Sequence, residues 1–367
     1  MNPEIETLLE ISHLYGNKKD YVIAGGGNTS YKNNSHLWIK ASGTSLAELT
    51  EDGLVCLSRQ CLRKIYTTTY SSNATTREEE VKKDMLSCVI SSSDKRPSVE
   101  TSLHDCIDFP FVVHTHPTLV NAVMCSRFVE NTVHRLFGES VLYMEYTDPG
   151  YVLFKKVNDR IQQFTAREDH APEVIFLQNH GVFVAGKTID DIKNTYLSIE
   201  QKINNEVHHM VPDPSHSANT LEQLCNAISS ETGKVAISAY SKLIQHFASD
   251  GKNYQKIARP FTPDSIVYCK SNYLFIKDEN DLIKQILLFE KEFGHLPKII
   301  IVNNKGMIAL DDSLKTAETA MEVFEDMMKV STLSENFGGP NCMSDEQIQF
   351  IDTWEIENYR RKMNQGS

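Results

Sequence analysis

Two histidines in alternate positions of a short apolar run could bind one metal ion. The run covers residues 111–116 (FVVHTH), and Pro117 follows it. Because alternate residues of a β-strand point to the same face, the imidazoles of His114 and His116 can reach one cation. Proline cannot continue a strand but suits the first turn of a helix, so we expect the pair near the carboxyl end of a strand. Histidines at strand ends are also often only hydrogen-bonded, so this pair alone leaves metal binding open.

A third histidine, His180, follows the apolar residues 174–177. Gly181 comes next and permits a tight turn that would expose the imidazole. Three histidines leave one coordination position for water or substrate, as a catalytic zinc ion requires. Five further histidines are less well placed, and we expect them to be surface or core residues: His104, His134, His170, His208 and His209.

An acidic residue, Glu100, lies shortly before the paired histidines in the segment 96–104 (RPSVETSLH). The segment is expected to be a turn that enters a helix. A carboxylate beside a metal ion can act as an acid or base. Equally, a glutamate in the first turn of a helix is favoured by the helix dipole, so both interpretations stay open on this segment alone.

Two glycine-containing segments could bind an anion, namely residues 24–30 (AGGGNTS) and 40–45 (KASGTS). Glycines let backbone N–H groups approach an anion closely, and the hydroxyl and amide side chains add donors. Neither segment is a Walker loop, and Ser30 stands where a dinucleotide fingerprint has its third glycine, so nucleotide binding is not supported. A purely structural turn is the alternative.

Hydrophobic patterns predict alternating strands and helices in the first half of the chain. Helices are expected at 5–15 and 78–90, and strands at 21–23, 36–40, 54–57, 111–114, 174–177 and 182–185. The proline-containing segment 207–220 predicts a connector, so we place a domain boundary between residues 212 and 213. Beyond it we expect helices within 221–248, strands at 265–267, 273–276 and 298–303, a helix at 281–293 and a long helix from 313.

Residues 174–201 and 299–330 share a pattern: an apolar strand, Asn-X-Gly, a second apolar run and a helix. The variable residue X is His180 in the first segment and Lys305 in the second. A common glycine-containing hairpin before a helix would explain the similarity. Alternatively, the second segment is a degenerate copy that has lost the metal ligand and serves packing or assembly.

Composition describes an ordinary globular chain of 367 residues with a net charge of −12. This charge argues against nucleic-acid or anionic-membrane partners, which are bound through clustered Lys and Arg. The eight cysteines form no C-x-x-C pair, so we expect buried or free thiols rather than a zinc ribbon or a disulfide framework. The amino-terminal segment resembles no signal peptide, and the expected location is the cytoplasm.

Five motifs occur in the order shown by class II aldolase/adducin domains: G-G-G-N-T-S, K-A-S-G-T, R-P-S-x-E, H-T-H-P and N-H-G. The resemblance covers about residues 1–210 and is closest to the aldolase part of bifunctional rhamnulose-1-phosphate aldolase/alcohol dehydrogenases. It implies a layered α/β/α domain with a central mixed sheet over 1–212. Residues 213–367 are then a smaller α/β companion domain, in which no dehydrogenase-type cofactor loop follows residue 210.

The resemblance also implies a set of site residues. His114, His116 and His180 would bind Zn²⁺, and Glu100 would be the acid/base. The substrate phosphate would lie against Gly27, Asn28, Ser42, Gly43 and Ser98. Relatives often use a phenol as a second acid/base, for which Tyr146 is the candidate and Tyr151 the alternative. Val99 departs from the family, because monofunctional aldolases carry a second hydroxyl residue there as a phosphate donor.

The implied activity is zinc-dependent cleavage of a ketose 1-phosphate, similar to rhamnulose 1-phosphate, to dihydroxyacetone phosphate and an aldehyde. Family members commonly form cyclic tetramers, so we expect a homo-oligomer. Epimerases and dehydratases on the same scaffold are alternatives, as is a non-catalytic, adducin-like interaction module. A Schiff-base aldolase is not expected, because no lysine lies in an obviously apolar strand that would lower its pKa.

Overall fold

The computed structural model describes residues 2–91, 95–217 and 221–353, which form two compact units. The first unit contains the chain up to residue 120 together with 130–205. The second contains 121–129 and the chain from residue 206 onward. The division into an aldolase-like domain and a companion domain between residues 212 and 213 stays a prediction.

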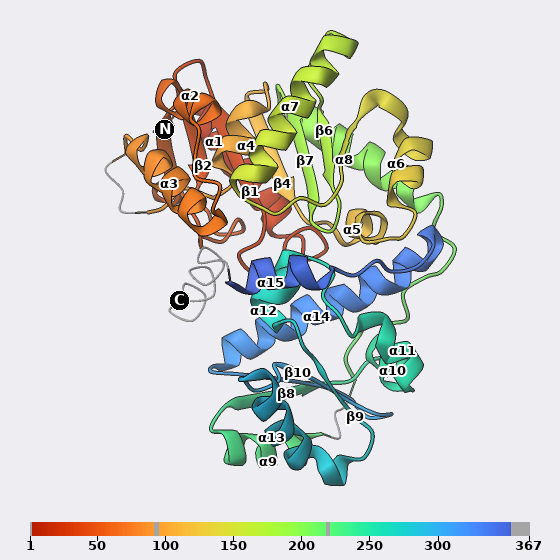
Figure 1. Ribbon diagram of the computed structural model, residues 1–367. Helices are drawn as coiled ribbons and strands as arrows, with labels where there is room; N and C mark the ends of the chain where they lie inside the picture. Colours follow the sequence, from red (N-terminus) through yellow and green to blue (C-terminus); the bar gives the residue numbers. More distant parts are fainter. Residues whose placement is uncertain (1, 92–94, 218–220, 354–367) are drawn as a thin grey trace. The chain divides into compact units, whose positions relative to one another are not determined.

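The first unit is built on a mixed sheet of seven strands in the order β3-β2-β1-β4-β7-β6-β5 (Figure 1). The strands are β1 (Asn28–Lys32), β2 (His36–Lys40), β3 (Leu54–Ser58), β4 (Phe111–Thr115), β5 (Leu142–Met144), β6 (Val174–Leu177) and β7 (Gly181–Gly186). Only the pairing of β5 with β6 is parallel; the other neighbours are antiparallel. The central position of β4 and β7 brings the two histidine-bearing segments together.

Eight α-helices accompany the strands of this sheet in the chain. They are α1 (Pro3–Gly16), α2 (Arg59–Thr67), α3 (Ala74–Ser87), α4 (Thr101–Cys106), α5 (Thr118–Met124), α6 (Val129–Phe137), α7 (Tyr151–Glu168) and α8 (Ile189–Asn204). Several begin where the side chain of the preceding residue accepts a backbone N–H bond, as Asn2 does for α1 and Ser58 does for α2. Such caps satisfy donors that would otherwise lack a partner at a helix start.

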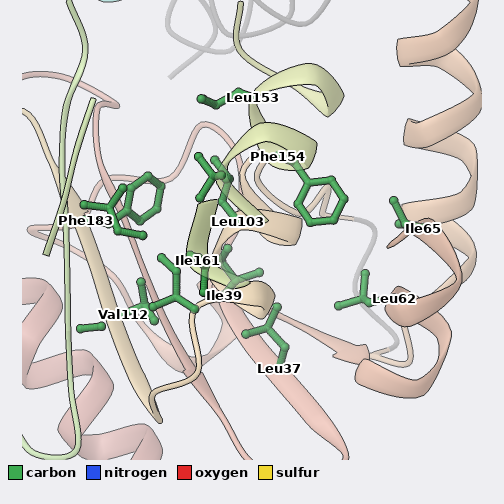
Figure 2. Close-up of a cluster of buried hydrophobic side chains, with 14 of the residues drawn as sticks. Leu37, Ile39, Leu62, Ile65, Leu103, Val112, Leu153, Phe154, Ile161 and Phe183 are labelled. Carbon is green, nitrogen blue, oxygen red and sulfur yellow. The ribbon is translucent and has the colours of Figure 1, made fainter. Parts of the chain in front are cut away.

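Helices cover both faces of the seven-stranded sheet. On one face, Val112 and Phe183 pack with side chains from α2, α3, α4 and α7 in a single buried cluster (Figure 2). The opposite face of β4 carries Thr115, whose hydroxyl lies 2.6 Å from the hydroxyl of Tyr196 in α8. Tyr196 in turn packs against Tyr15 of α1, with ring centroids 4.6 Å apart. The expected layered α/β/α arrangement with a central mixed sheet is confirmed.

Several predicted elements were wrong. Residues 21–23 are not a strand but part of a turn, in which Tyr21 N–H donates to the Lys18 carbonyl. The apolar residues 265–267 lie in a helix, α12 (Pro263–Cys269), because Thr262 caps it and Pro263 occupies its first turn. Helices occupy both ends of the segment 221–248 as expected, but an unpredicted strand, β8 (Val235–Ala239), lies between them.

The second unit contains a four-stranded sheet in the order β8-β11-β10-β9, with β9 (Leu274–Ile276), β10 (Ile299–Val302) and β11 (Gly306–Asp311). Its helices are α9 (Glu222–Thr232), α10 (Lys242–Ala248), α11 (Gly251–Tyr254), α12, α13 (Leu282–Phe293), α14 (Leu314–Ser334) and α15 (Asp345–Thr353). A buried cluster joins α9 and α13 to the strands. This is the second, smaller α/β region that was expected.

The two sheets share one topology, since β4-β7-β6-β5 and β8-β11-β10-β9 have the same order and the same strand directions. Val174 pairs with Val184 in the first hairpin. In the second hairpin the residues 125 positions further along, Ile299 and Ala309, also pair with each other. The turn residues Asn179 and Asn304, also 125 apart, both have positive φ.

The helix that follows each hairpin extends the match. Thr188 and Ser313, again 125 residues apart, both form capping boxes at the start of α8 and α14. Strand order, register and cap are all repeated, which a common hairpin alone would not predict, and this favours the interpretation of the second sheet as a degenerate copy of half the first. Strand register places Ser238, Tyr240 and Lys305 where the first unit has His114, His116 and His180.

Two further findings concern the chain as a whole. A disulfide joins Cys61 in α2 to Cys88 at the end of α3, with Cα atoms 5.3 Å apart, which corrects the expectation of buried or free thiols for these two cysteines; the other six are free. The two cysteines lie 27 residues apart and carry no spacing signal, so only the packing of α2 on α3 reveals the pair. Among the described helices, none has an apolar stretch long enough to cross a bilayer.

Candidate metal centre

The three predicted histidines come together at the carboxyl end of β4. His114 lies in β4, His116 just after it, and His180 in the turn between β6 and β7. Thr115 pairs with Val182 across β4 and β7, which fixes the distance between the two segments. One ring nitrogen from each histidine lies within 4.8 Å of the other two, and the Nε2 atoms of His114 and His116 are 2.9 Å apart.

The turn that presents His180 depends on its neighbours. Asn179 adopts a left-handed conformation with φ 54°, which asparagine tolerates better than most residues. At Gly181, a Cβ atom would lie 2.5 Å from the Thr115 carbonyl oxygen and 2.7 Å from Cδ2 of His116. A glycine is therefore needed for the turn to approach β4 closely enough to complete the cluster.

His114 is fully buried and its ring is oriented by two contacts. Its Nδ1 lies 3.0 Å from the Val182 carbonyl oxygen, so Nδ1–H donates there and Nε2 is left with a lone pair facing the other histidines. The ring of Phe183 stacks on it with centroids 4.2 Å apart. Hydrogen bonding of the second ring nitrogen to a carbonyl is the usual way in which a metal-binding histidine is held.

Glu100 completes the cluster from the start of α4. Its Oε1 lies 3.3 Å from Nε2 of His114 and 3.6 Å from Nε2 of His180. This carboxylate is buried, and Oε1 has no hydrogen-bond partner among the described residues. A buried acceptor without a donor, beside three converging imidazoles, fits a divalent cation or a ligand bound to one.

The residues expected to hold phosphate gather beside Glu100. The Asn28 amide donates to Glu100 Oε2 at 2.5 Å and to the Ser98 hydroxyl at 3.3 Å. Ser42 N–H donates to the Arg96 carbonyl, so the segment with Ser42 and Gly43 runs beside the segment that ends in Ser98.

Gly27 precedes this group with φ 66°, and a Cβ there would lie 2.8 Å from the His114 carbonyl oxygen. The structure thus brings Gly27, Asn28 and Ser98 next to the histidine cluster. Ser42 and Gly43 lie on the adjoining strand end. Whether these residues bind phosphate stays a prediction.

Tyr146 is connected to the cluster only indirectly. It follows β5, and its backbone N–H donates to Oε1 of Gln178, two residues before His180. Burial and the nearby charge of Asp148 raise the pKa of the Tyr146 phenol. It therefore stays protonated here and could act as an acid rather than a base. The backbone N–H of Tyr151 donates to Glu78, and its phenol donates to the Thr68 carbonyl. Because the phenol is directed there, Tyr151 is the weaker candidate.

Sequence reasoning missed two buried polar residues close to this site. His104 was assigned to the surface or core; it is buried, and its ring contacts Asn28 and Ser30. Lys32 lies buried in β1 and donates to the His104 carbonyl at 2.7 Å. Burial lowers the pKa of Lys32 to about 7, although its strand, with the sequence NTSYK, is not the apolar strand in which such a lysine was expected. The spacing of Glu100 and His104, one helical turn apart, was the available signal.

A family model described as the class II aldolase and adducin N-terminal domain matches residues 6–205. Two curated proteins are similar to the same half of the chain. An uncharacterized oxidoreductase of Bacillus subtilis, YuxG, is 27% identical over 217 residues, which are 56% of this chain and 30% of that protein. L-fuculose phosphate aldolase of Methanocaldococcus jannaschii is 24% identical over 195 residues, covering 51% of this chain and 84% of that enzyme.

Among solved structures, the N-terminal class II aldolase domain of a conserved Thermoplasma acidophilum protein is similar at 22% identity and a TM-score of 0.48. The match covers 56% of this chain and 94% of that domain. The chain thus spans most of the length of the aldolase relatives but less than a third of the length of YuxG.

Proposed function

The chain belongs to the family of class II aldolase and adducin N-terminal domains, and from this we propose that it is a metal-dependent aldolase. The proposed substrate is a ketose 1-phosphate similar to rhamnulose 1-phosphate, cleaved to dihydroxyacetone phosphate and an aldehyde. The observation that carries the proposal is the buried Glu100 Oε1 facing His114 and His180 without a hydrogen-bond donor.

The ligand set supports zinc as the metal. Imidazole nitrogens suit Zn²⁺, and three protein ligands leave a position for substrate oxygen, which is typical of catalytic rather than structural zinc. His114, His116 and His180 would hold the ion. When bound there, it would supply a Lewis acid at the substrate's carbonyl and hydroxyl oxygens.

Glu100 is proposed to move the proton at carbon. In cleavage the C3–C4 bond breaks, the C4 hydroxyl loses its proton as the aldehyde forms, and C3 gains one proton to give dihydroxyacetone phosphate. Glu100 is anchored through Oε2 by the Asn28 amide, while Oε1 points toward the histidines. One oxygen is thus held and the other is left to exchange a proton with substrate.

The remaining assignments rest on the same site. Asn28, Ser98 and the backbone at Gly27 offer polar groups beside Glu100, where a phosphate ester of the substrate would be held, with Ser42 and Gly43 at its edge. Tyr146, protonated because of its raised pKa, would hydrogen-bond the distal hydroxyl during cleavage and would protonate the aldehyde oxygen in the reverse condensation. A homo-oligomer in the cytoplasm is the expected setting.

The test uses the purified full chain with rhamnulose 1-phosphate and fuculose 1-phosphate. A coupled assay detects dihydroxyacetone phosphate, and mass analysis separates cleavage into two fragments from epimerisation and from loss of water. We expect cleavage, and a fall in kcat of about 10²- to 10⁴-fold in Glu100→Gln.

The matched control is Glu78→Gln, which changes a buried carboxylate that contacts Arg77 and the Tyr151 N–H rather than the histidines. Bound metal is measured in both variants. Product of unchanged mass, or loss of water, would replace cleavage by epimerase or dehydratase activity. Full turnover of metal-loaded Glu100→Gln would remove Glu100 from the chemistry.

A further inference from the structure

A continuous chain of hydrogen bonds runs from Glu100 into the core on one face of β1. Asn28, Ser30 and Lys32 alternate along this strand, so their side chains share a face. Helix α4 lies on that face; Glu100 is the N-cap residue that precedes it, and His104 lies one turn further on. Both Asn28 and His104 are buried, so each of their polar groups requires a partner inside the protein.

The partners fix the orientation of the Asn28 amide. The Glu100 carboxylate accepts hydrogen bonds, so the Asn28 nitrogen that lies 2.5 Å from it must donate. The Asn28 oxygen therefore points away from Glu100, toward Nε2 of His104, to which it is hydrogen-bonded. An amide oxygen only accepts, so His104 must carry a proton on Nε2.

The other ring nitrogen of His104 fixes the tautomer. Nδ1 lies 2.7 Å from the Ser30 hydroxyl, which can donate to it when Nδ1 is unprotonated. Burial, with the nearby His114, Lys32 and Lys40, lowers the pKa of His104 well below its usual value, in accord with a neutral ring. Both nitrogens of the Nε2–H tautomer are then satisfied, and neither contacts the metal-binding imidazoles.

The helix that carries both residues is fixed independently at its far end. The Asp105 carboxylate pairs with Arg59 at 2.5 Å and accepts a hydrogen bond from the Tyr66 hydroxyl at 2.7 Å. Lys32 binds the His104 carbonyl. Loss of the His104 ring donor would thus leave α4 in place and release only the Asn28 amide.

We propose that His104 is a positioning residue for the reaction: its Nε2–H holds the Asn28 oxygen, so that the Asn28 N–H₂ faces and orients the Glu100 carboxylate. Without that donor the buried Asn28 oxygen has lost its partner, and the amide is no longer held with its N–H₂ directed at Glu100. The inference rests on the proposed function, because it assigns a role to Glu100 in catalysis.

Two substitutions separate this role from packing. The terminal amide nitrogen of glutamine reaches about as far as Nε2 of histidine, whereas the asparagine amide reaches only the Nδ1 position. We expect His104→Asn to lower kcat for ketose 1-phosphate cleavage about 10- to 100-fold, the effect of weakening the Asn28 hydrogen bond to the charged Glu100 carboxylate. His104→Gln should recover most of this loss. Bound metal should equal that of the wild type in both.

Tyr66→Phe serves as the structural control, since it removes a partly buried hydrogen bond to the same helix without touching Asn28. We expect it to lower the melting temperature but to leave kcat unchanged. Equal kcat in the Gln and Asn variants would overturn the proposal, as would a loss in His104→Asn that appears in KM alone.

A readout independent of turnover distinguishes failure of this inference from failure of the proposed function. In ¹⁵N-labelled protein, the His104 ring should show the shifts of a neutral imidazole protonated at Nε2. An Nδ1–H tautomer or a charged ring would overturn the hydrogen-bond assignment even if cleavage is confirmed. Absence of cleavage with an Nε2–H ring would instead reject the aldolase activity and leave the positioning of Glu100 by Asn28 intact.

Discussion

Substitution of Gly181 by alanine should damage the metal centre while changing no ligand. The added Cβ would lie 2.5 Å from the Thr115 carbonyl oxygen and 2.7 Å from Cδ2 of His116, where ordinary contacts begin at 3.4 Å. The His180 turn and the end of β4 must therefore separate by about 0.9 Å. Metal–ligand distances tolerate only about 0.2 Å, so a shift of this size cannot leave all three histidines in place.

We expect Gly181→Ala to weaken zinc binding by at least about 10- to 100-fold, as changes that misplace a ligand do. Affinity is measured by competition with a chromogenic chelator. Gly251→Ala is the control, because a Cβ at Gly251 meets no atom within 4 Å. Thermal unfolding of both variants verifies that they are folded. Wild-type zinc affinity in a folded Gly181→Ala protein would show that the close approach of the turn to β4 does not shape the site.

Three further predictions concern stability. The pKa of buried Lys32 is lowered to about 7, so above that pH the folded chain binds fewer protons than the unfolded chain. The free energy of unfolding of the wild type should therefore rise between about pH 7 and 10, by up to about 1.4 kcal/mol per pH unit. Lys32→Met should lack this rise in urea unfolding at pH 7 and 9, and an identical pH dependence would contradict the burial of a neutral amine. Under oxidising conditions, the double variant Cys61→Ser, Cys88→Ser should be less stable than the wild type by about 3 to 4 kcal/mol, the value for a separation of 27 residues. After the wild type is reduced, the two proteins should be equally stable. Equal stability already under oxidising conditions would argue against the disulfide. Thr188→Ala and Ser313→Ala should each cost about 1 kcal/mol by guanidinium unfolding, because both residues cap helices in the same way; a loss in only one would separate the two copies energetically.

The metal ligands could be predicted because each stands at the end of a strongly apolar strand. Strands β2 and β6 have the predicted bounds, β4 is one residue longer at its carboxyl end, and β7 is one residue longer at each end. These strands form because their apolar side chains are buried, and a run of apolar residues in the sequence predicts such burial. The histidines interrupt that pattern at the point where the chain leaves the sheet.

Strand β1 could not be predicted in the same way, because its buried face carries Asn28, Ser30 and Lys32. Hydrogen bonds to α4 make their burial possible, and those bonds join residues more than 70 positions apart. For the same reason His104 was placed among uninvolved histidines. A polar residue is satisfied by its three-dimensional neighbours, which local periodicity does not contain.

In the second unit, the structure supports the similarity between residues 174–201 and 299–330 more strongly than their sequences do. In the sequence, the similarity was limited to one apolar strand, the Asn-X-Gly turn, a second apolar run and a helix, whereas strand order and register match throughout the shared sheet. Backbone geometry is retained where ligands are not: Lys305 stands at the position of His180 and pairs with Glu279. One metal site per chain is therefore expected.

The most direct test of a metal-dependent aldolase is the metal content of the purified chain, measured together with release of dihydroxyacetone phosphate before and after EDTA. We predict about one zinc ion per chain, loss of cleavage with the chelator, and recovery when zinc is restored. Full cleavage by a folded, metal-free protein would contradict the role of the three histidines. A folded protein that binds no metal and cleaves neither sugar phosphate would contradict the aldolase itself and favour an adducin-like interaction module.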